Sequence, residues 1–193
     1  MSAPLPRART AGHAAADPAS GLASDPAASR SRTARVWRVG ADVDTDALAP
    51  GRWMAQPLPL LAEYCLASLR PEFAREVRPG VVLAAGPNFG IGSSREQAAA
   101  ALRHLGVAAV IAPSFGGIFF RNAVNLGLPV LECADAERLH DGERIELDAR
   151  AGVIRRADGE RIACTPLPPF LWEIVAAGGL LPHLKKRMEP SSS

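Results

Sequence analysis

The residues with the clearest chemical potential lie in a glycine-rich segment, GPNFGIGSSRE, at Gly86–Glu96. An apolar run precedes this segment, and a stretch with helical periodicity follows it. Glycines let a ligand approach the backbone, and a helix N-terminus presents unpaired N–H groups and a partial positive charge. The planar guanidinium of Arg95 matches a carboxylate. The segment therefore predicts an anion site, although it lacks the lysine of a P-loop and the spacing of a dinucleotide-binding loop.

The same segment also has a purely structural interpretation. Ser93 to Glu96 reads S-x-x-E, the pattern of a capping box, in which the Ser93 hydroxyl accepts from the Glu96 N–H at the start of a helix. Arg95 is then an ordinary solvated arginine. The residues alone leave both interpretations open.

A second polar segment contains Asp42, Asp44 and Asp46 at alternate positions. The D-x-D-x-D pattern is that of a calcium loop, but the glycine at the sixth position and the distal glutamate are missing. Aspartate and threonine are also turn formers after a strand, which is the plainer interpretation.

Alternating strands and helices must position these two segments. Apolar runs predict strands at 35–40, 81–85, 107–113 and 128–132, with helices at 58–65, from Ser93 to Leu105, and around 119–126. This order predicts a parallel α/β core. Alternation at 143–148 and two runs on either side of Asp158-Gly159 predict an antiparallel appendix with a hairpin, and a last helix ends at Gly178-Gly179.

Composition limits the classes of protein to consider. The chain has 193 residues, 48% hydrophobic and 22% charged, with a net charge of +2, so it can bury a core and does not suggest a nucleic-acid or membrane-surface protein. No apolar run reaches the about 18 residues of a membrane span. Residues 1–34 are rich in Ala, Ser and Arg, which predicts a disordered tail, as does the polar end at 188–193. The bias of the first segment also fits a mitochondrial transit peptide, but a solvated tail is the simpler interpretation.

The three cysteines, Cys65, Cys133 and Cys164, are widely spaced and form no CxxC pair. They predict neither a metal site nor a disulfide framework, and they favour a reducing compartment, the cytoplasm. The chain by itself has no obvious ligand set for an iron–sulfur cluster.

Taken together, four segments resemble the small subunit of the 3-isopropylmalate dehydratase and homoaconitase family, the swivelling domain of aconitase. They are DVDTDALAPGRW (42–53), AGPNFGIGSSREQA (85–98), VIAPSFGGIFFRNAVNLGLPVLE (110–132) and PPFLWEIVAAGGLLP (168–182). The resemblance covers residues 35–187 and implies one swivelling β/β/α domain, with a parallel or mixed sheet flanked by helices and a C-terminal antiparallel hairpin.

The resemblance implies a hydro-lyase that removes water from a 2-hydroxy dicarboxylic acid and adds it back. A large partner subunit carries the [4Fe–4S] cluster, and this chain carries no cofactor. Ser93 is then the base that takes a proton, while Ser94 and Arg95 contact the substrate carboxylate. Asp46 pairs with a histidine of the partner, and Asp42 and Asp44 shape the loop.

In this family, the loop after the aspartates selects the side group of the substrate. Here that loop consists of Arg52, Trp53, Met54, Ala55 and Gln56. Its apolar wall favours an alkyl substituent, which predicts 3-isopropylmalate dehydratase of leucine biosynthesis. The small Ala55 also suggests an alternative, a methylmalate/citraconate or dimethylmalate hydratase. A non-catalytic carboxylate-binding module is a further alternative, because Ile91 and Gln97 depart from the family pattern.

Overall fold

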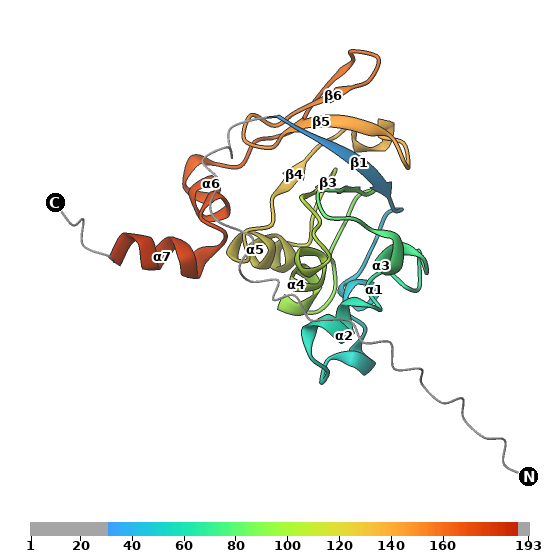
Figure 1. Cartoon of the computed structure of the whole chain (residues 1–193), viewed down its shortest axis with the longest axis vertical. Helices are drawn as coiled ribbons and strands as arrows, with labels where there is room; N and C mark the ends of the chain where they lie inside the picture. Colours follow the sequence, from blue (N-terminus) through green and yellow to red (C-terminus); the bar gives the residue numbers. More distant parts are fainter. Residues whose placement is uncertain (1–30, 189–193) are drawn as a thin grey trace, which may run out of the picture.

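The computed structural model describes residues 31–188, and it builds them around one seven-stranded sheet of order β4-β3-β2-β1-β5-β6-β7 (Figure 1). Strands β1 to β4 are parallel, and β5 to β7 are antiparallel. The strands are β1 (Arg32–Arg38), β2 (Val82–Ala84), β3 (Ala109–Ala112), β4 (Val130–Glu132), β5 (Arg144–Asp148), β6 (Val153–Arg156) and β7 (Arg161–Ala163). The predicted α/β core and C-terminal hairpin are therefore confirmed.

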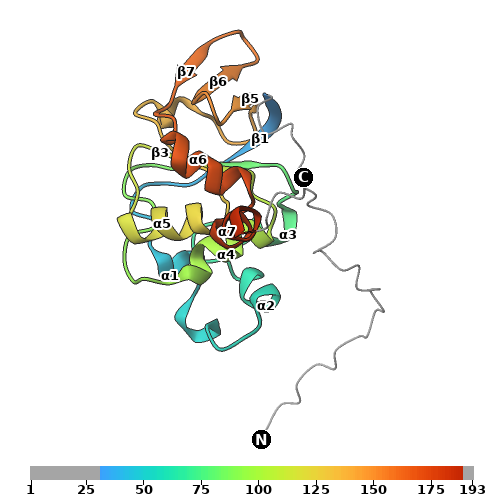
Figure 2. The same cartoon turned by 90° about the vertical axis from the view of Figure 1, so that its left-hand side faces the viewer.

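The described residues also contain seven α-helices and two 3₁₀ turns, the last two helices following β7. They are α1 (Thr45–Leu48), η2 (Gly51–Trp53), α2 (Leu58–Ala62), α3 (Phe73–Glu76), α4 (Glu96–His104), α5 (Gly117–Asn125), η3 (Ala136–Arg138), α6 (Pro169–Ala176) and α7 (Leu180–Met188). In the view of Figure 1, the antiparallel strands lie at the top and α1, α2, α4 and α5 lie below; Figure 2 shows the same arrangement from the side.

The two faces of the parallel strands bury two separate cores, because successive side chains of a strand point to opposite faces. Leu83 and Val110 face the helices and pack with residues of α1 to α6 such as Leu102. Their neighbours Val82 and Ile111 face the other core, where β5 to β7 supply the covering side chains. The antiparallel strands thus form a layer of the core and not a mere appendix.

The curl of the sheet brings its two edge strands together. Glu132 at the end of β4 pairs with Thr165, just after β7, in an isolated antiparallel bridge, and the Thr165 N–H donates to the Glu132 carbonyl over 2.7 Å. Cys133 and Cys164 lie beside this bridge as buried free thiols. The bridge joins the edge of the parallel half to the edge of the antiparallel half.

The elements differ from expectation in several places, and four of these differences affect the ends or the number of the main elements. β1 begins at Arg32, because residues 32–34, which we expected in the tail, pair with β5 and bury Ala34. α2 ends at Ala62, and the chain then continues in turns. α4 begins at Glu96 and not at Ser93. The helix α7 was missed, since the left-handed Gly178 and Gly179 redirect the chain into a further helix. The rest of the predicted tails, 1–30 and 189–193, lies outside the described residues.

Gly90 allows the loop after β2 to lie against α5. Its φ is +77°, and a Cβ built there would lie 2.3 Å from Cγ of the buried Phe119. A side chain at this position is therefore strained in its backbone and would clash with a core ring.

We expect Gly90→Ala to lower the free energy of unfolding by about 3 kcal/mol, from left-handed backbone strain together with overpacking. The matched control is Gly117→Ala, because nothing lies within 4 Å of a Cβ at Gly117, in the first turn of α5. The control should change stability by less than about 1 kcal/mol. Urea denaturation followed by circular dichroism measures both, and equal stability of the two variants would contradict this packing.

Candidate functional site

The two polar segments singled out in the sequence meet at the carboxyl ends of the neighbouring strands β1 and β2. Three backbone hydrogen bonds join them. The Asp42 N–H donates to the Pro87 carbonyl over 2.9 Å. Closer in sequence to Asp46 and Arg95, the Gly90 N–H donates to the Val43 carbonyl over 2.6 Å and the Thr45 N–H donates to the Ile91 carbonyl over 2.8 Å. We call this last pair of bonds the loop clasp. It places Asp46 and Arg95, which are far apart in sequence, side by side.

Asp46 and Arg95 form the charged centre of the site. Nη1 of Arg95 donates to Oδ1 of Asp46 over 2.5 Å and to the Ala49 carbonyl over 3.1 Å, and the Gly51 N–H donates to the same Oδ1 over 3.0 Å. The hydrogen bond from Arg95, followed by that from the Gly51 N–H, lowers the pKa of the Asp46 carboxyl below its usual value.

The remaining donors of Arg95 are free for a ligand. Its Nε and Nη2 have no hydrogen-bond acceptor among residues 31–188. Its side chain is 25% exposed, and that of Asp46 is 62% exposed. A guanidinium held along one edge presents its other edge to a planar carboxylate.

Ser93 and Ser94, which directly precede Arg95 in the chain, are exposed. The capping-box interpretation of Ser93 is wrong: the N-cap of α4 is Arg95, with no side-chain capping bond, and the Ser93 carbonyl accepts from the Arg95 N–H over 2.9 Å. The Ser93 hydroxyl instead lies 3.3 Å from Oγ1 of Thr45. Thr45 is not singled out by the sequence analysis, because threonine and aspartate in this segment are both interpreted as turn formers.

The other two aspartates shape the loop, as expected. Oδ1 of Asp44 caps α1 by accepting from the Ala47 N–H over 2.7 Å. Asp42 has a φ of +55° and accepts from Nδ2 of Asn88 over 2.8 Å, a second tie between the two loops. A calcium role is not needed to explain either residue.

The predicted specificity loop follows directly from the charged centre. Trp53 stacks on Tyr64 with ring centroids 4.1 Å apart, and the guanidinium of Arg52 lies 6.0 Å from the Trp53 ring. Trp53 and Met54 are half-buried against the helix-side core, whereas Arg52, Ala55 and Gln56 are exposed. Trp53 and Met54 are therefore fixed against the core, and only Ala55 of the apolar residues in this loop is exposed. The role of the loop in substrate selection stays a prediction.

Comparison with known proteins settles the family. The 3-isopropylmalate dehydratase small subunit of Methanosarcina mazei is 49% identical over 154 residues, which are 79% of this chain and 95% of that protein. This chain belongs to the family of 3-isopropylmalate dehydratase small subunits. The model of the aconitase C-terminal domain matches residues 71–136. The isopropylmalate/citramalate isomerase small subunit of Methanocaldococcus jannaschii is 43% identical over 160 residues, 81% of this chain and 95% of that protein.

A solved structure agrees with the family assignment. A crystal structure titled 3-isopropylmalate dehydratase, also from Methanocaldococcus jannaschii, superposes with a TM-score of 0.77 at 40% identity. The match covers 82% of this chain and 95% of that one. The swivelling-domain fold expected from the sequence is therefore confirmed.

The iron–sulfur cluster that this dehydratase family implies does not fit the residues that the structure describes. Residues 31–188 contain no group of three or more His, Cys, Asp or Glu able to hold a metal ion. The three cysteines are buried free thiols, and burial raises the pKa of Cys65 above the usual range, so that it does not offer the thiolate that a cluster needs.

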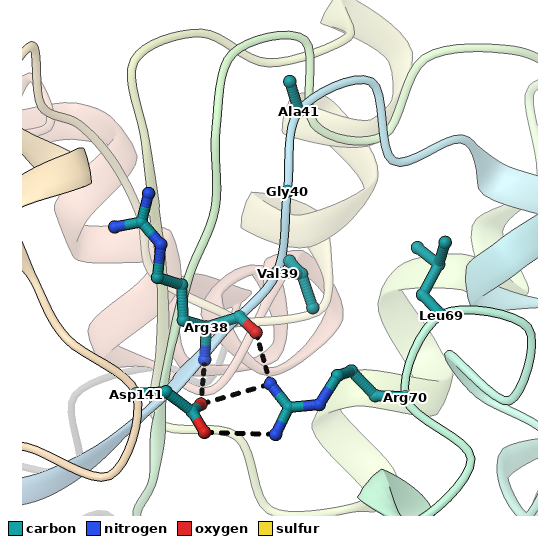
Figure 3. Close-up of a pocket in the computed structure, with 7 residues that line it drawn as sticks. All are labelled: Arg38, Val39, Gly40, Ala41, Leu69, Arg70 and Asp141. Carbon is teal, nitrogen blue, oxygen red and sulfur yellow. Dashed lines mark hydrogen bonds and ion pairs between the residues drawn. The ribbon is translucent and has the colours of Figure 1, made fainter.

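A cavity of about 430 Å³ lies where β1 ends, and none of the residues of the charged centre lines it (Figure 3). Asp141 accepts there from the Arg38 N–H over 2.7 Å and from both Nη atoms of Arg70, while Arg70 also donates to the Arg38 carbonyl and lies over Trp37. Burial alone would raise the pKa of Asp141, but these donors outweigh it and lower the pKa. Because its charges are already paired, we interpret this cluster as a structural clamp.

No helix among the described residues is long and apolar enough to cross a membrane.

We expect Arg95→Gln to raise the pKa of Asp46 towards 3.8, its ordinary value, because the variant removes the main hydrogen bond to the carboxylate. In the wild type, the lowered pKa makes this pair stabilising above the unfolded-state pKa, and the contribution is lost as pH falls through the folded-state value. The control Arg52→Gln removes only a weak, longer-range charge and should shift the pKa less. Carbon-13 NMR titration of the Asp46 carboxyl measures both; an unchanged pKa in Arg95→Gln would contradict the pairing.

Proposed function

We propose that this chain is the small subunit of a heteromeric hydro-lyase that dehydrates and rehydrates a 2-hydroxy dicarboxylic acid, with 3-isopropylmalate as substrate. The observation that carries the proposal is the group of exposed residues Ser93, Ser94 and Asp46 around the half-buried Arg95, in a chain 49% identical to a 3-isopropylmalate dehydratase small subunit. A cluster of this kind on an open surface suits a half-site that a second subunit completes.

Each residue has a role that its surroundings support. Arg95, held on one side by Asp46, offers its free Nε and Nη2 to a substrate carboxylate, and the exposed Ser94 hydroxyl adds a donor. Ser93 is the base, since it precedes the N-terminus of α4, whose partial positive charge stabilises an alkoxide, and its hydroxyl lies within 3.3 Å of the Thr45 hydroxyl. By resemblance to the family, the exposed Asp46 also orients a histidine of the partner.

The proposed reaction conserves atoms and charge. The Ser93 alkoxide takes the proton from the carbon next to the carboxylate that Arg95 holds. The electron pair of that C–H bond forms the double bond, and the hydroxyl on the adjacent carbon departs with the electrons of its C–O bond. The departed hydroxide and the proton on Ser93 together amount to one water. On rehydration, hydroxide adds to the carbon that lost the proton and Ser93 returns its proton to the neighbouring carbon, which moves the hydroxyl and restores the alkoxide. A [4Fe–4S] cluster, which we assign to the large partner subunit, supplies Lewis-acid assistance to the hydroxyl when bound there.

The assembly and the compartment are part of the same proposal. A large cluster-bearing subunit is the protein partner, and the hydroxy dicarboxylate is the small-molecule partner. We propose a cytoplasmic location for the complex, which suits three cysteines held as free thiols.

We expect Ser93→Ala to lower kcat by about a hundred- to ten-thousand-fold in the complex with the large subunit encoded by the same organism, the usual contribution of a general base. The control Ser68→Ala removes an exposed hydroxyl outside the site and should be fully active. Anaerobic isomerisation of 3-isopropylmalate is the assay, and size-exclusion chromatography checks assembly. Full activity of Ser93→Ala would refute the mechanism. An assembled but inactive wild type that still binds dicarboxylates would favour the non-catalytic module.

A second substrate class is favoured by one specific observation. Ala55 is small and exposed, and a relative that is 43% identical is named isopropylmalate/citramalate isomerase small subunit. A smaller alkyl group at the substrate, as in methylmalate/citraconate or dimethylmalate, therefore defines the alternative.

We expect the complex to turn over isopropylmaleate with a higher kcat/KM than citraconate, because the half-buried Trp53 and Met54 offer apolar surface to the larger alkyl group. Initial rates of hydration for both compounds, with dimethylmaleate as a third, measure the preference. A citraconate preference of about tenfold, equivalent to about 1.4 kcal/mol, would replace isopropylmalate by the smaller substrate.

A further inference from the structure

Thr45 is the one buried residue with a polar, non-cysteine side chain among residues 31–188, with 2% of its surface exposed. A buried hydroxyl is costly unless it is hydrogen-bonded. The single side-chain partner of Thr45 within the described residues is the Ser93 hydroxyl, 3.3 Å from Oγ1. The two hydroxyls differ in access, because Ser93 is exposed and Thr45 lies beneath it.

The backbone of Thr45 is fixed on both sides. Its N–H donates to the Ile91 carbonyl as part of the loop clasp, and its carbonyl accepts from the Ala49 N–H over 2.9 Å as α1 forms. Threonine is also branched at Cβ, so few side-chain rotamers are open to it. The position of Oγ1 is therefore set by the fold and not by its hydrogen bond to Ser93.

The segment before Ser93 is shaped to pass over this hydroxyl. Gly92 has a φ of +105°, and a Cβ there would lie 3.1 Å from Oγ1 of Thr45. A larger residue would press on Thr45 and would strain the backbone, so glycine brings the Ser93 hydroxyl close to Thr45 without a clash.

The distance between the two hydroxyls allows a hydrogen bond in either direction. At 3.3 Å the contact is longer than the about 2.7 Å typical of O–H···O bonds, and bonds to an ionised oxygen are shorter still. An alkoxide on Ser93 would therefore draw the Thr45 hydroxyl closer than a neutral hydroxyl does. Since an alkoxide accepts and cannot donate, Thr45 is then the donor.

We propose that Thr45 is a positioning residue for Ser93: its buried hydroxyl donates to Oγ of Ser93, sets the rotamer of the base and stabilises the alkoxide. This inference rests on the proposed function, because it assumes that Ser93 takes the proton. The proposed role of Thr45 leaves the hydrogen bond between the neighbouring Arg95 and Asp46 unchanged.

Three substitutions test the inference in the complex with the large subunit. Thr45→Val keeps the shape and removes the hydroxyl, Thr45→Ser keeps the hydroxyl, and Thr33→Val makes the same chemical change on the exposed side of β1. We expect Thr45→Val to lower kcat about 10- to 100-fold with KM within threefold, and Thr45→Ser and Thr33→Val to remain within threefold of the wild type. A substrate deuterated at the abstracted position should show a larger isotope effect on kcat in Thr45→Val, because proton transfer becomes more nearly rate-limiting.

The outcomes separate this inference from the proposed function. Wild-type kcat and isotope effect in Thr45→Val would overturn the role of Thr45, as would equal damage in Thr45→Val and Thr45→Ser, which indicates packing alone. Full activity of Ser93→Ala would instead overturn the proposed function. If Thr45→Val does not assemble with the partner, Thr45→Ala compared with Thr45→Ser carries the same comparison with a smaller side chain.

Discussion

The loop clasp is the interaction on which the candidate site depends. Two hydrogen bonds between peptide groups, from Gly90 to Val43 and from Thr45 to Ile91, hold together loops that leave neighbouring parallel strands. Backbone bonds of this kind leave the side chains of both loops free for chemistry. The clasp lies where Asp46 contacts Arg95 and Thr45 contacts Ser93, and Asp42 adds further hydrogen bonds between the same two loops.

Glycines and aspartates make the clasp geometrically possible. Gly90 avoids the Phe119 ring and Gly92 avoids the Thr45 hydroxyl, so the chain after β2 lies close to both α5 and α1. Asp44 caps α1 through the Ala47 N–H. The polar atoms of these loops are thus divided between structure and chemistry: Asp42 and Asp44 complete turns, while Asp46 and Arg95 remain accessible.

Much of this arrangement could be predicted from the sequence, because apolar runs and glycine-rich turns are local signals. The order of strands from Val81 to Glu132 and the Asp158-Gly159 hairpin follow from such patterns. Two features could not be read in this way. Thr45 is buried against a loop nearly fifty residues away, and Arg95, at the N-cap of α4, pairs with Asp46 from that same distant segment. Both are set by tertiary contacts.

The central position of β1 has a consequence for how the chain folds. The strand that opens the described chain pairs with β2 on one side and with β5 on the other, where Arg32 meets Leu147. Pairings between such distant segments close long loops and are slow to form. During synthesis, the edge of β1 that pairs with β5 stays uncovered until β5 has left the ribosome. The sheet therefore reaches its final form late, and an unfinished chain exposes an open edge that chaperones would need to shield.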